Sequence, residues 1–94
     1  MRISASEQVQ LWLSGLPPDT KRRVRAAFKA LPAGDVKALR EDLEGFYRLR
    51  VGNYRVVYHL EAGSHLLLDY ADLREVVYET FKQLRALSEM PGEY

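Results

Sequence analysis

Hydrophobic and polar residues follow two different periods along the chain, and the change of period divides the chain into elements. Toward the N-terminus, apolar residues recur every three or four positions, which predicts helices over about 5–15 and 18–31. The run Ser4-Ala5-Ser6-Glu7 is a capping-box pattern, and Pro17-Pro18 separates the two helices. The buried stripe expected for the second helix comprises Val24, Ala27, Phe28 and Leu31.

From residue 46 onward, the pattern changes to alternation of apolar and polar residues, which is typical of half-buried strands. Three such runs cover residues 46–51, 54–60 and 65–70. Gly52-Asn53 separates the first two runs and predicts a two-residue hairpin, because both residue types tolerate the positive φ that primed turns need.

The segments that flank the strands predict the remaining elements. Residues 35–44 form a charged connection whose Leu39 and Leu43 are expected to pack under the second helix. Asp72, with Glu75 three residues later, predicts the start of a last helix. The apolar side of that helix comprises Leu73, Val76, Val77, Phe81, Leu84 and Leu87.

The predicted fold class is α+β, with two N-terminal helices, a three- to four-stranded antiparallel sheet and a C-terminal helix. The fourth strand is a short one at residues 1–3, and the helices are expected on one face of the sheet. A chain of 94 residues, 47% of them apolar, predicts one domain over residues 1–94. The chain has no cysteine and no apolar segment of membrane-spanning length, so we expect a cytoplasmic protein with no metal and no other cofactor.

The hairpin determines which strand residues share a face. A two-residue loop pairs Arg50 with Arg55 and Arg48 with Val57, so the three arginines project from the same face. The opposite face, expected in the core, comprises Tyr47, Leu49, Val51, Tyr54, Val56, Tyr58 and Leu60. Like charges directly opposite each other destabilise a sheet. The cluster therefore indicates a polyanion site, in which phosphates supply the countercharge.

A simpler interpretation of the arginines stays open at this point. Acids from elsewhere in the chain, such as Glu41, Asp42 or Glu44, can neutralise them. Charge is unevenly distributed, since residues 1–60 carry 11 Lys and Arg against 6 Asp and Glu. Arginine outnumbers lysine 10 to 4, which suits bidentate phosphate contacts but also follows from a GC-rich or thermophilic source.

The last helix carries a second set of candidate residues. At about 100° per residue, Arg74, Tyr78 and Arg85 fall on one flank of this helix, with Lys82 near them. A basic group and a phenol four residues apart can face the same point in space, although a tyrosine beside an apolar stripe is also a common edge residue.

The run YRLRVGNYRVVY (47–58) resembles the hairpin signature of the RelE/ParE superfamily of bacterial type II toxin–antitoxin toxins. DLREVVYETF (72–81) is similar to the C-terminal basic-x-x-x-Tyr segment of that family, and the order of the elements also matches. The resemblance implies a ribosome-dependent mRNA endoribonuclease that inhibits translation. Its partners would be the ribosome, mRNA and a cognate antitoxin, with DNA contacted only through the antitoxin.

The resemblance also implies a mechanism, in which the 2′-hydroxyl of the RNA attacks the adjacent phosphate and leaves a 2′,3′-cyclic phosphate. Positions that match the working residues of the family are Arg55, Arg74 and Tyr78 for catalysis and Arg48 and Arg50 for RNA binding. Lys82 and Arg85 are expected to extend the RNA-binding surface along the last helix.

The chain departs from the family at two points. Some members have lysines at the positions of Arg48 and Arg50, and arginine cannot easily act as a general base. Many members also have a Gly-His-Arg sequence before the last helix, where this chain has Ala71-Asp72-Leu73-Arg74. Proton abstraction then falls to Tyr78, to His59 or to the ribosome.

Two other functions remain compatible with the sequence. The ParE branch shares the fold but inhibits DNA gyrase and needs no RNase site. A toxin-fold protein can also be a non-catalytic binding module that acts with its antitoxin. The joint presence of Arg55, Arg74 and Tyr78 favours the endoribonuclease.

Overall fold

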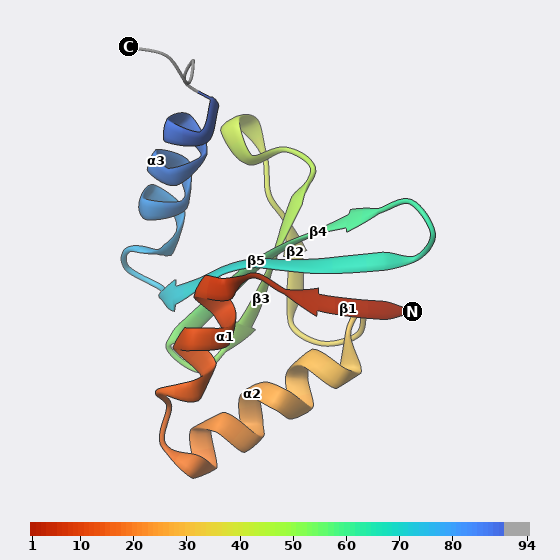
Figure 1. Ribbon diagram of the computed structural model, residues 1–94, viewed down its shortest axis with the longest axis vertical. Coiled ribbons are helices and arrows are strands. Elements are labelled where there is room, and N and C mark those ends of the chain that lie inside the picture. Colours follow the sequence, from red (N-terminus) through yellow and green to blue (C-terminus); the bar gives the residue numbers. More distant parts are fainter. Residues whose placement is uncertain (90–94) are drawn as a thin grey trace.

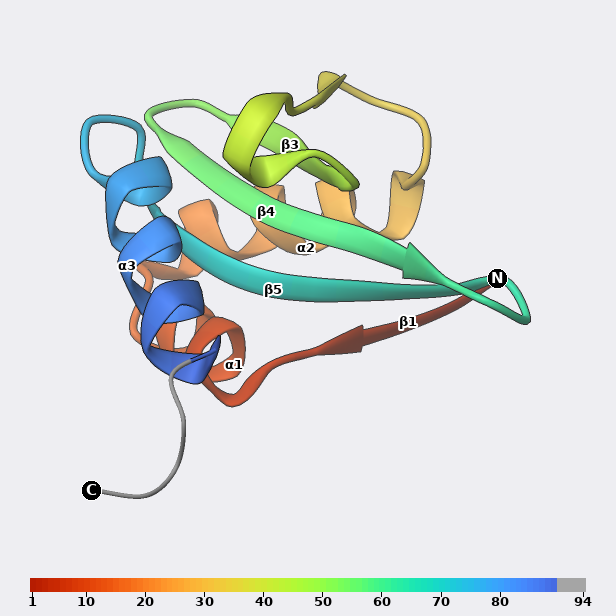
Figure 2. The ribbon, with the colours of Figure 1, turned by 90° about the horizontal axis from the view of Figure 1, so that it is seen from above.

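The computed structural model describes residues 1–89, and the last five residues of the predicted domain lie outside this part of the chain. A five-stranded mixed sheet, in the order β1-β5-β4-β3-β2, forms its centre (Figure 1; Figure 2). The elements are β1 (Arg2–Ala5), α1 (Glu7–Ser14), α2 (Pro18–Ala30), β2 (Val36–Ala38), the 3₁₀-helix η1 (Glu41–Leu43), β3 (Phe46–Val51), β4 (Tyr54–Glu61), β5 (His65–Leu73) and α3 (Val77–Glu89). The predicted α+β class is confirmed.

The predicted N-terminal strand is present as β1, and β2 is an additional strand, so the sheet has five strands rather than the predicted three or four. The strand β2 lies within the segment expected to be a connection, and it pairs antiparallel with β3. The strand β1 pairs parallel with β5, so the sheet is mixed rather than purely antiparallel. Beyond the end of β1, the Gln8 side chain continues the pairing with two hydrogen bonds to the backbone of Ala71, at 2.7 and 2.9 Å.

The helices cover both faces of the sheet, and the prediction of helices on one face was wrong. Figure 1 shows α1 and α2 below the sheet, and α3 with η1 above it. Val56 packs in the core under α1 and α2, while its neighbour Val57 packs in the core under α3, and both are 0% exposed. Leu43 belongs to the α3 core and not to a contact under α2.

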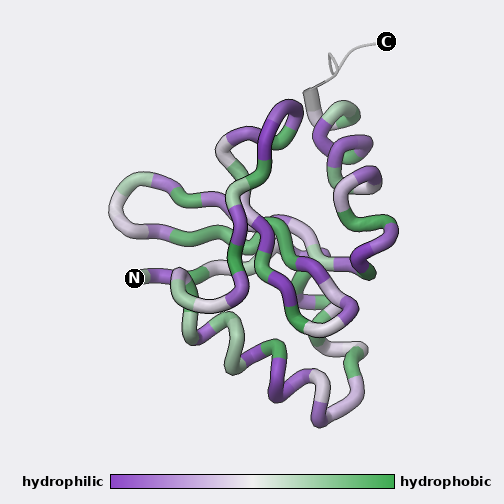
Figure 3. Tube along the Cα trace, turned by 180° about the vertical axis from the view of Figure 1, so that it is seen from behind, coloured by the Kyte–Doolittle hydropathy of each residue, from purple (hydrophilic) through white to green (hydrophobic). Residues whose placement is uncertain are grey.

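The predicted register of the β3–β4 hairpin is confirmed, with Arg50 opposite Arg55 and Arg48 opposite Val57. Of the two turn residues, Gly52 alone has a positive φ, of 58°. A glycine with positive φ at the first central position is the pattern of a type II′ turn, whose twist matches that of the flanking strands. Figure 3 shows the resulting alternation of hydrophobic and hydrophilic positions along the central strands.

The N-terminal helices are close to their predicted limits. The helix α1 begins at Glu7 because β1 extends through Ala5, and the Ser6 hydroxyl caps it by accepting a hydrogen bond from the backbone N–H of Val9 at 3.2 Å. The helix α2 begins at Pro18, as predicted. No helix within residues 1–89 is long and apolar enough to cross a membrane.

The C-terminal helix begins later than predicted. Asp72 does not cap α3 but lies in β5, opposite Arg55 of β4, and the strand continues to Leu73. The helix begins at Val77, so its buried side differs from the expected stripe. Of that stripe, Val77 and Phe81 are buried, whereas the exposed members are Leu73, Val76, Leu84 and Leu87.

The register of the hairpin depends on Gly52, and this dependence can be tested. In Gly52→Ala the new Cβ would occupy a left-handed conformation, which costs about 1–2 kcal/mol for an L-residue. We therefore expect a clear fall in the thermal unfolding midpoint. Gly15→Ala is the matched control, because Gly15 has a φ of −87° and alanine fits there without strain. Equal midpoints for the two variants would contradict this role of Gly52.

Candidate functional site

The hairpin arginines lie on the face of the sheet that carries α3, next to the core under that helix. Arg48 is opposite Val57, a member of this core, and its side chain is only 17% exposed. Arg50, nearer the turn, is 56% exposed. The predicted segregation of the arginines from the α1 and α2 core is correct, but their face is partly covered by α3 and is not an open surface.

Asp35, just before β2, neutralises part of the cluster. Its Oδ1 accepts a hydrogen bond from Arg48 Nη1 at 3.0 Å, and its Oδ2 lies 3.3 Å from Arg50 Nε. The hydrogen bond from Arg48, together with the charges of the nearby arginines, lowers the pKa of the Asp35 carboxyl. An acid from elsewhere in the chain thus neutralises part of the cluster, as the simpler interpretation of the sequence allowed, but this acid is Asp35 and not one of those in residues 41–44.

Arg55 and Arg74 lie together at the tip of the hairpin. Arg55 Nη1 donates to the carbonyl oxygen of Gly52 at 3.0 Å. The backbone N–H of Arg74 donates to Asn53 O at 2.9 Å, and its Nε donates to Glu75 Oε1 at 3.1 Å. A hydrogen bond to its own backbone and the neighbouring Arg74 lower the pKa of the Glu75 carboxyl, and the charge of Arg55 contributes to the same shift.

Tyr78, in the first turn of α3, lines a hollow of about 340 Å³ together with Arg48 of β3. The remaining lining residues are Lys37, Ala38, Leu39 and Arg40, from β2 and the segment that follows it. Lys37 is the cross-strand partner of Arg48. The sequence-based search missed Lys37 and Arg40, because a strand of three residues gives too little alternation to be recognised.

Lys82 and Arg85 lie apart from these residues. They line a second hollow, of about 380 Å³, between α3 and η1. The Arg85 guanidinium lies 4.7 Å from the centre of the Phe46 ring and donates to Asp42 O at 3.2 Å. The predicted single flank of the last helix is thus divided in two, because Arg74 precedes α3 and Arg85 turns toward η1.

Comparison with known proteins gives matches only at the level of structure. No family model and no curated protein matches the chain. The toxin–antitoxin complex RelBE2 from Mycobacterium tuberculosis contains a chain with a TM-score of 0.67 and 23% identity, over 78% of this chain and 96% of that one. A chain of the RelB–RelE complex from Methanococcus jannaschii has a TM-score of 0.65 and 19% identity, over 82% of this chain and 96% of that one. A chain of the YoeB–YefM complex from Staphylococcus aureus has a TM-score of 0.61 and 18% identity, over 79% of this chain and 97% of that one.

The chain has the RelE-like toxin fold. The fold that the sequence resemblance implied is thereby confirmed. At these identities the likeness concerns the RelE-like backbone alone, so the roles of individual side chains depend on the geometry described above.

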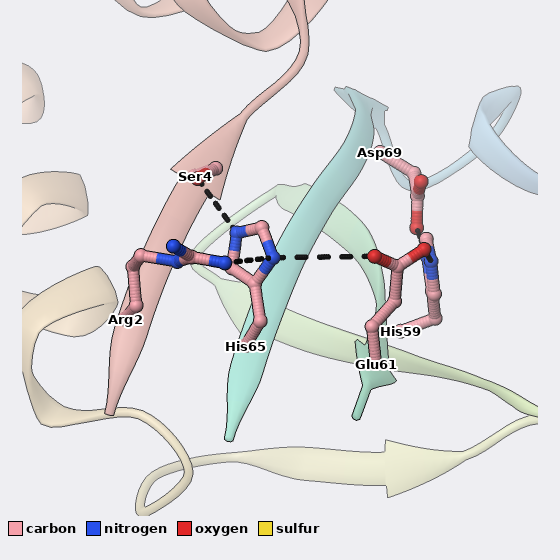
Figure 4. A network of polar contacts seen from close by, with 6 residues as sticks. All are labelled: Arg2, Ser4, His59, Glu61, His65 and Asp69. Atoms are coloured by element: carbon pink, nitrogen blue, oxygen red, sulfur yellow. Dashed lines mark hydrogen bonds and ion pairs between the residues drawn. The ribbon is translucent and has the colours of Figure 1, made fainter. Parts of the chain in front are cut away.

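Within this RelE-like fold, His59 is held between two carboxylates (Figure 4). Its Nδ1 lies 2.6 Å from Asp69 Oδ2, and its Nε2 lies 3.3 Å from Glu61 Oε2. A β-bulge in β5 leaves Asp69 without a cross-strand partner, which lets its carboxylate reach the face of His59. With both ring nitrogens engaged, His59 offers no free nitrogen to accept a proton from a substrate.

The pKa values of this pair are both raised, for different reasons. Burial by itself lowers the pKa of His59, but the hydrogen bonds and charges of Asp69 and Glu61 outweigh it and raise that pKa. Burial raises the pKa of the Asp69 carboxyl, and the nearby His59 only partly offsets this effect.

The other histidine, His65, lies at the far end of the sheet from the arginine cluster. Its Nε2 is 2.8 Å from Ser4 Oγ, and its Nδ1 is 3.2 Å from Arg2 Nη2. Figure 4 shows Glu61 between the two histidines. No group of three or more His, Cys, Asp or Glu side chains within residues 1–89 is arranged to hold a metal ion.

The raised pKa of His59 predicts a pH-dependent contribution to the stability of this RelE-like fold. Because the folded pKa exceeds the unfolded value of about 6.5, the contribution is complete below pH 6.5 and is lost as the pH rises through the folded pKa. The difference in unfolding midpoint between wild type and His59→Gln should therefore be largest near pH 6 and shrink toward pH 9. In an Asp69→Asn background the difference should lose most of this pH dependence. A difference that is constant across this range would contradict the ion pair.

Proposed function

We propose that this chain is the toxin of a type II toxin–antitoxin system and that it acts as a ribosome-dependent mRNA endoribonuclease that inhibits translation. The observation that supports this most is the cluster of arginines on adjacent strands, with Tyr78 in a basic hollow beside Arg48. The RelE-like fold supports the toxin assignment, because the matched structures are toxin–antitoxin complexes.

In the proposed reaction, the 2′-oxygen of a nucleotide forms a bond to the adjacent phosphorus while the bond to the 5′-oxygen breaks. The products are a 2′,3′-cyclic phosphate and a 5′-hydroxyl. Negative charge builds up on the non-bridging oxygens in the transition state, and the guanidinium groups of Arg55 and Arg74 would stabilise it. Arg48 and Arg50 would hold the RNA backbone, with a phosphate taking the place of the Asp35 carboxylate.

The group that accepts the 2′-hydroxyl proton has fewer candidates than the sequence suggested. Arginine stays protonated, so none of the arginines in the cluster can accept this proton. His59 does not fit either, because carboxylates contact both of its ring nitrogens. The proton therefore goes to a group of the ribosome, or to the Tyr78 oxygen while the Tyr78 hydroxyl gives its own proton to the departing 5′-oxygen. Tyr78 can also stack on a base, since its ring lines the hollow.

We also propose a small antitoxin as the partner, which covers the arginine face with its own carboxylates and carries the contacts to DNA. One carboxylate, that of Asp35, is shared between Arg48 and Arg50, so it balances only part of their charge. A partner that adds acids to this face would bind favourably and would block access of RNA to the arginines.

Single-turnover cleavage of mRNA on programmed ribosomes tests the catalytic roles. Arg55→Ala and Arg74→Ala should each slow cleavage by roughly 10²-fold or more, the effect of losing one transition-state donor, with much smaller effects on ribosome binding. Tyr78→Phe keeps the stacking ring and loses only the hydroxyl, so slower cleavage by this variant would report proton transfer. Arg25→Ala, on the exposed side of α2, removes the same charge and should cleave normally.

Near wild-type cleavage by both Arg55→Ala and Arg74→Ala would show that the site is assigned wrongly. Expression of the chain without its partner separates the proposed function from gyrase inhibition. Mapped mRNA 5′ ends should then show cuts within codons that depend on translation. An SOS response with cleaved DNA and intact mRNA would instead identify a gyrase inhibitor.

A further inference from the structure

We propose that the hollow between β2 and α3 is a second phosphate-binding subsite, in which Lys37 and Arg40 hold a flanking phosphate of the same single-stranded RNA. The ligand class rests on the proposed function, since RNA is the substrate in both cases. Neither residue was selected from the sequence, and β2 brings both beside Arg48 and Tyr78.

The first support is the chemistry of the lining. The volume of about 340 Å³ lies within the range of small-molecule sites. Three of the residues that line the hollow are cations, Lys37, Arg40 and Arg48, and none is an acid. Within residues 1–89, the side chains of Lys37 and Arg40 make no hydrogen bond or ion pair, whereas Arg48 is bound to Asp35. An anion that enters the hollow therefore meets two cations without displacing a carboxylate from them.

The second support is the position of the hollow relative to the arginine cluster. Lys37 of β2 pairs with Arg48 of β3, and Arg50 of β3 pairs with Arg55 of β4. Neighbouring strands lie about 4.8 Å apart, so these pairs form a row of positive charge across three strands. The row ends at the open edge of the sheet, since β2 is its last strand. An RNA backbone that follows this row would pass from the cluster into the hollow.

The third support distinguishes RNA from an acidic protein segment. Tyr78 places a partly buried aromatic ring in the wall of the hollow. Cations along a groove with an aromatic ring beside them are the combination that binds the backbone and the unstacked bases of single-stranded nucleic acids. An acidic peptide would use the cations and leave the ring without a function. The observations therefore favour RNA.

The test uses the double variant Lys37→Gln/Arg40→Gln. The matched control is Arg25→Gln/Lys29→Gln on α2, which removes the same charge from an exposed helix surface. The probe is a short single-stranded RNA whose attacking 2′-hydroxyl is replaced by hydrogen, so that it binds without being cut. Its affinity is measured over a range of salt concentrations. Loss of the one phosphate that this subsite neutralises should lower the slope of log K against log salt by about 0.7, with little change in the control.

The outcomes separate this inference from the proposed function. If wild type cuts mRNA but the double variant and the control bind the probe alike, the subsite is wrong and the function stands. If wild type cuts no mRNA but the double variant still shows the reduced slope, the subsite stands and the function fails. No measurable affinity of wild type for the probe at low salt would overturn the subsite. The subsite would also be overturned if the double variant no longer bound the antitoxin but showed the same salt dependence of RNA binding as wild type.

Discussion

The two-residue turn at Gly52-Asn53 is the constraint on which the rest of the structure depends. The positive φ of Gly52 allows a turn that fixes the register of β3 against β4. A slip of one residue would exchange the two faces of a strand. It would carry Leu49 to the face that α3 partly covers and Arg48 into the core under α1 and α2. The turn therefore determines both which strand residues enter this core and which residues form the arginine face, meaning Arg48, Arg50 and Arg55.

The fixed register has an electrostatic consequence, because it places Arg50 directly opposite Arg55. Acidic side chains of the same chain neutralise part of this positive charge. Asp35 contacts Arg50, and Glu75 lies beside Arg74 at the hairpin tip. Exposed ion pairs of this kind contribute roughly 0–1 kcal/mol each. A phosphate that accepts two hydrogen bonds from a guanidinium can replace such a carboxylate at small cost. The internal acids thus hold the arginines in place without blocking the site.

Sequence reasoning recovered the features that local patterns encode, which were the hairpin with its register, the helix α2 and the α+β class. It missed β2, because three residues carry too little periodicity. It misplaced the start of α3, because Asp72 and Glu75 fit a capping pattern that pairing of β5 with β4 overrides. The site residues that depend on strand pairing were missed for the same reason.

The candidate site was found only in part, for a similar reason. The arginines of β3 and β4 are close in sequence, so their shared face could be predicted from alternation. Asp35 lies 13 residues before Arg48, and its approach depends on how the chain enters β2. Lys37 reaches the same face only through that strand pairing. Contacts of this kind follow from the tertiary fold, and no local pattern encodes them.

The central claim is that the arginine face binds phosphate and that Asp35 occupies it in the free protein. The most direct measurement follows the side-chain Nε–H resonances of the arginines by NMR, during titration with a cleavage-resistant single-stranded RNA. The resonances of Arg48 and Arg50 should shift first, and in Asp35→Asn they should shift at several-fold lower RNA concentration. Arg25 on α2 should not respond at these concentrations. Arginine resonances that all shift together, with the same titration curve in Asp35→Asn, would contradict the account.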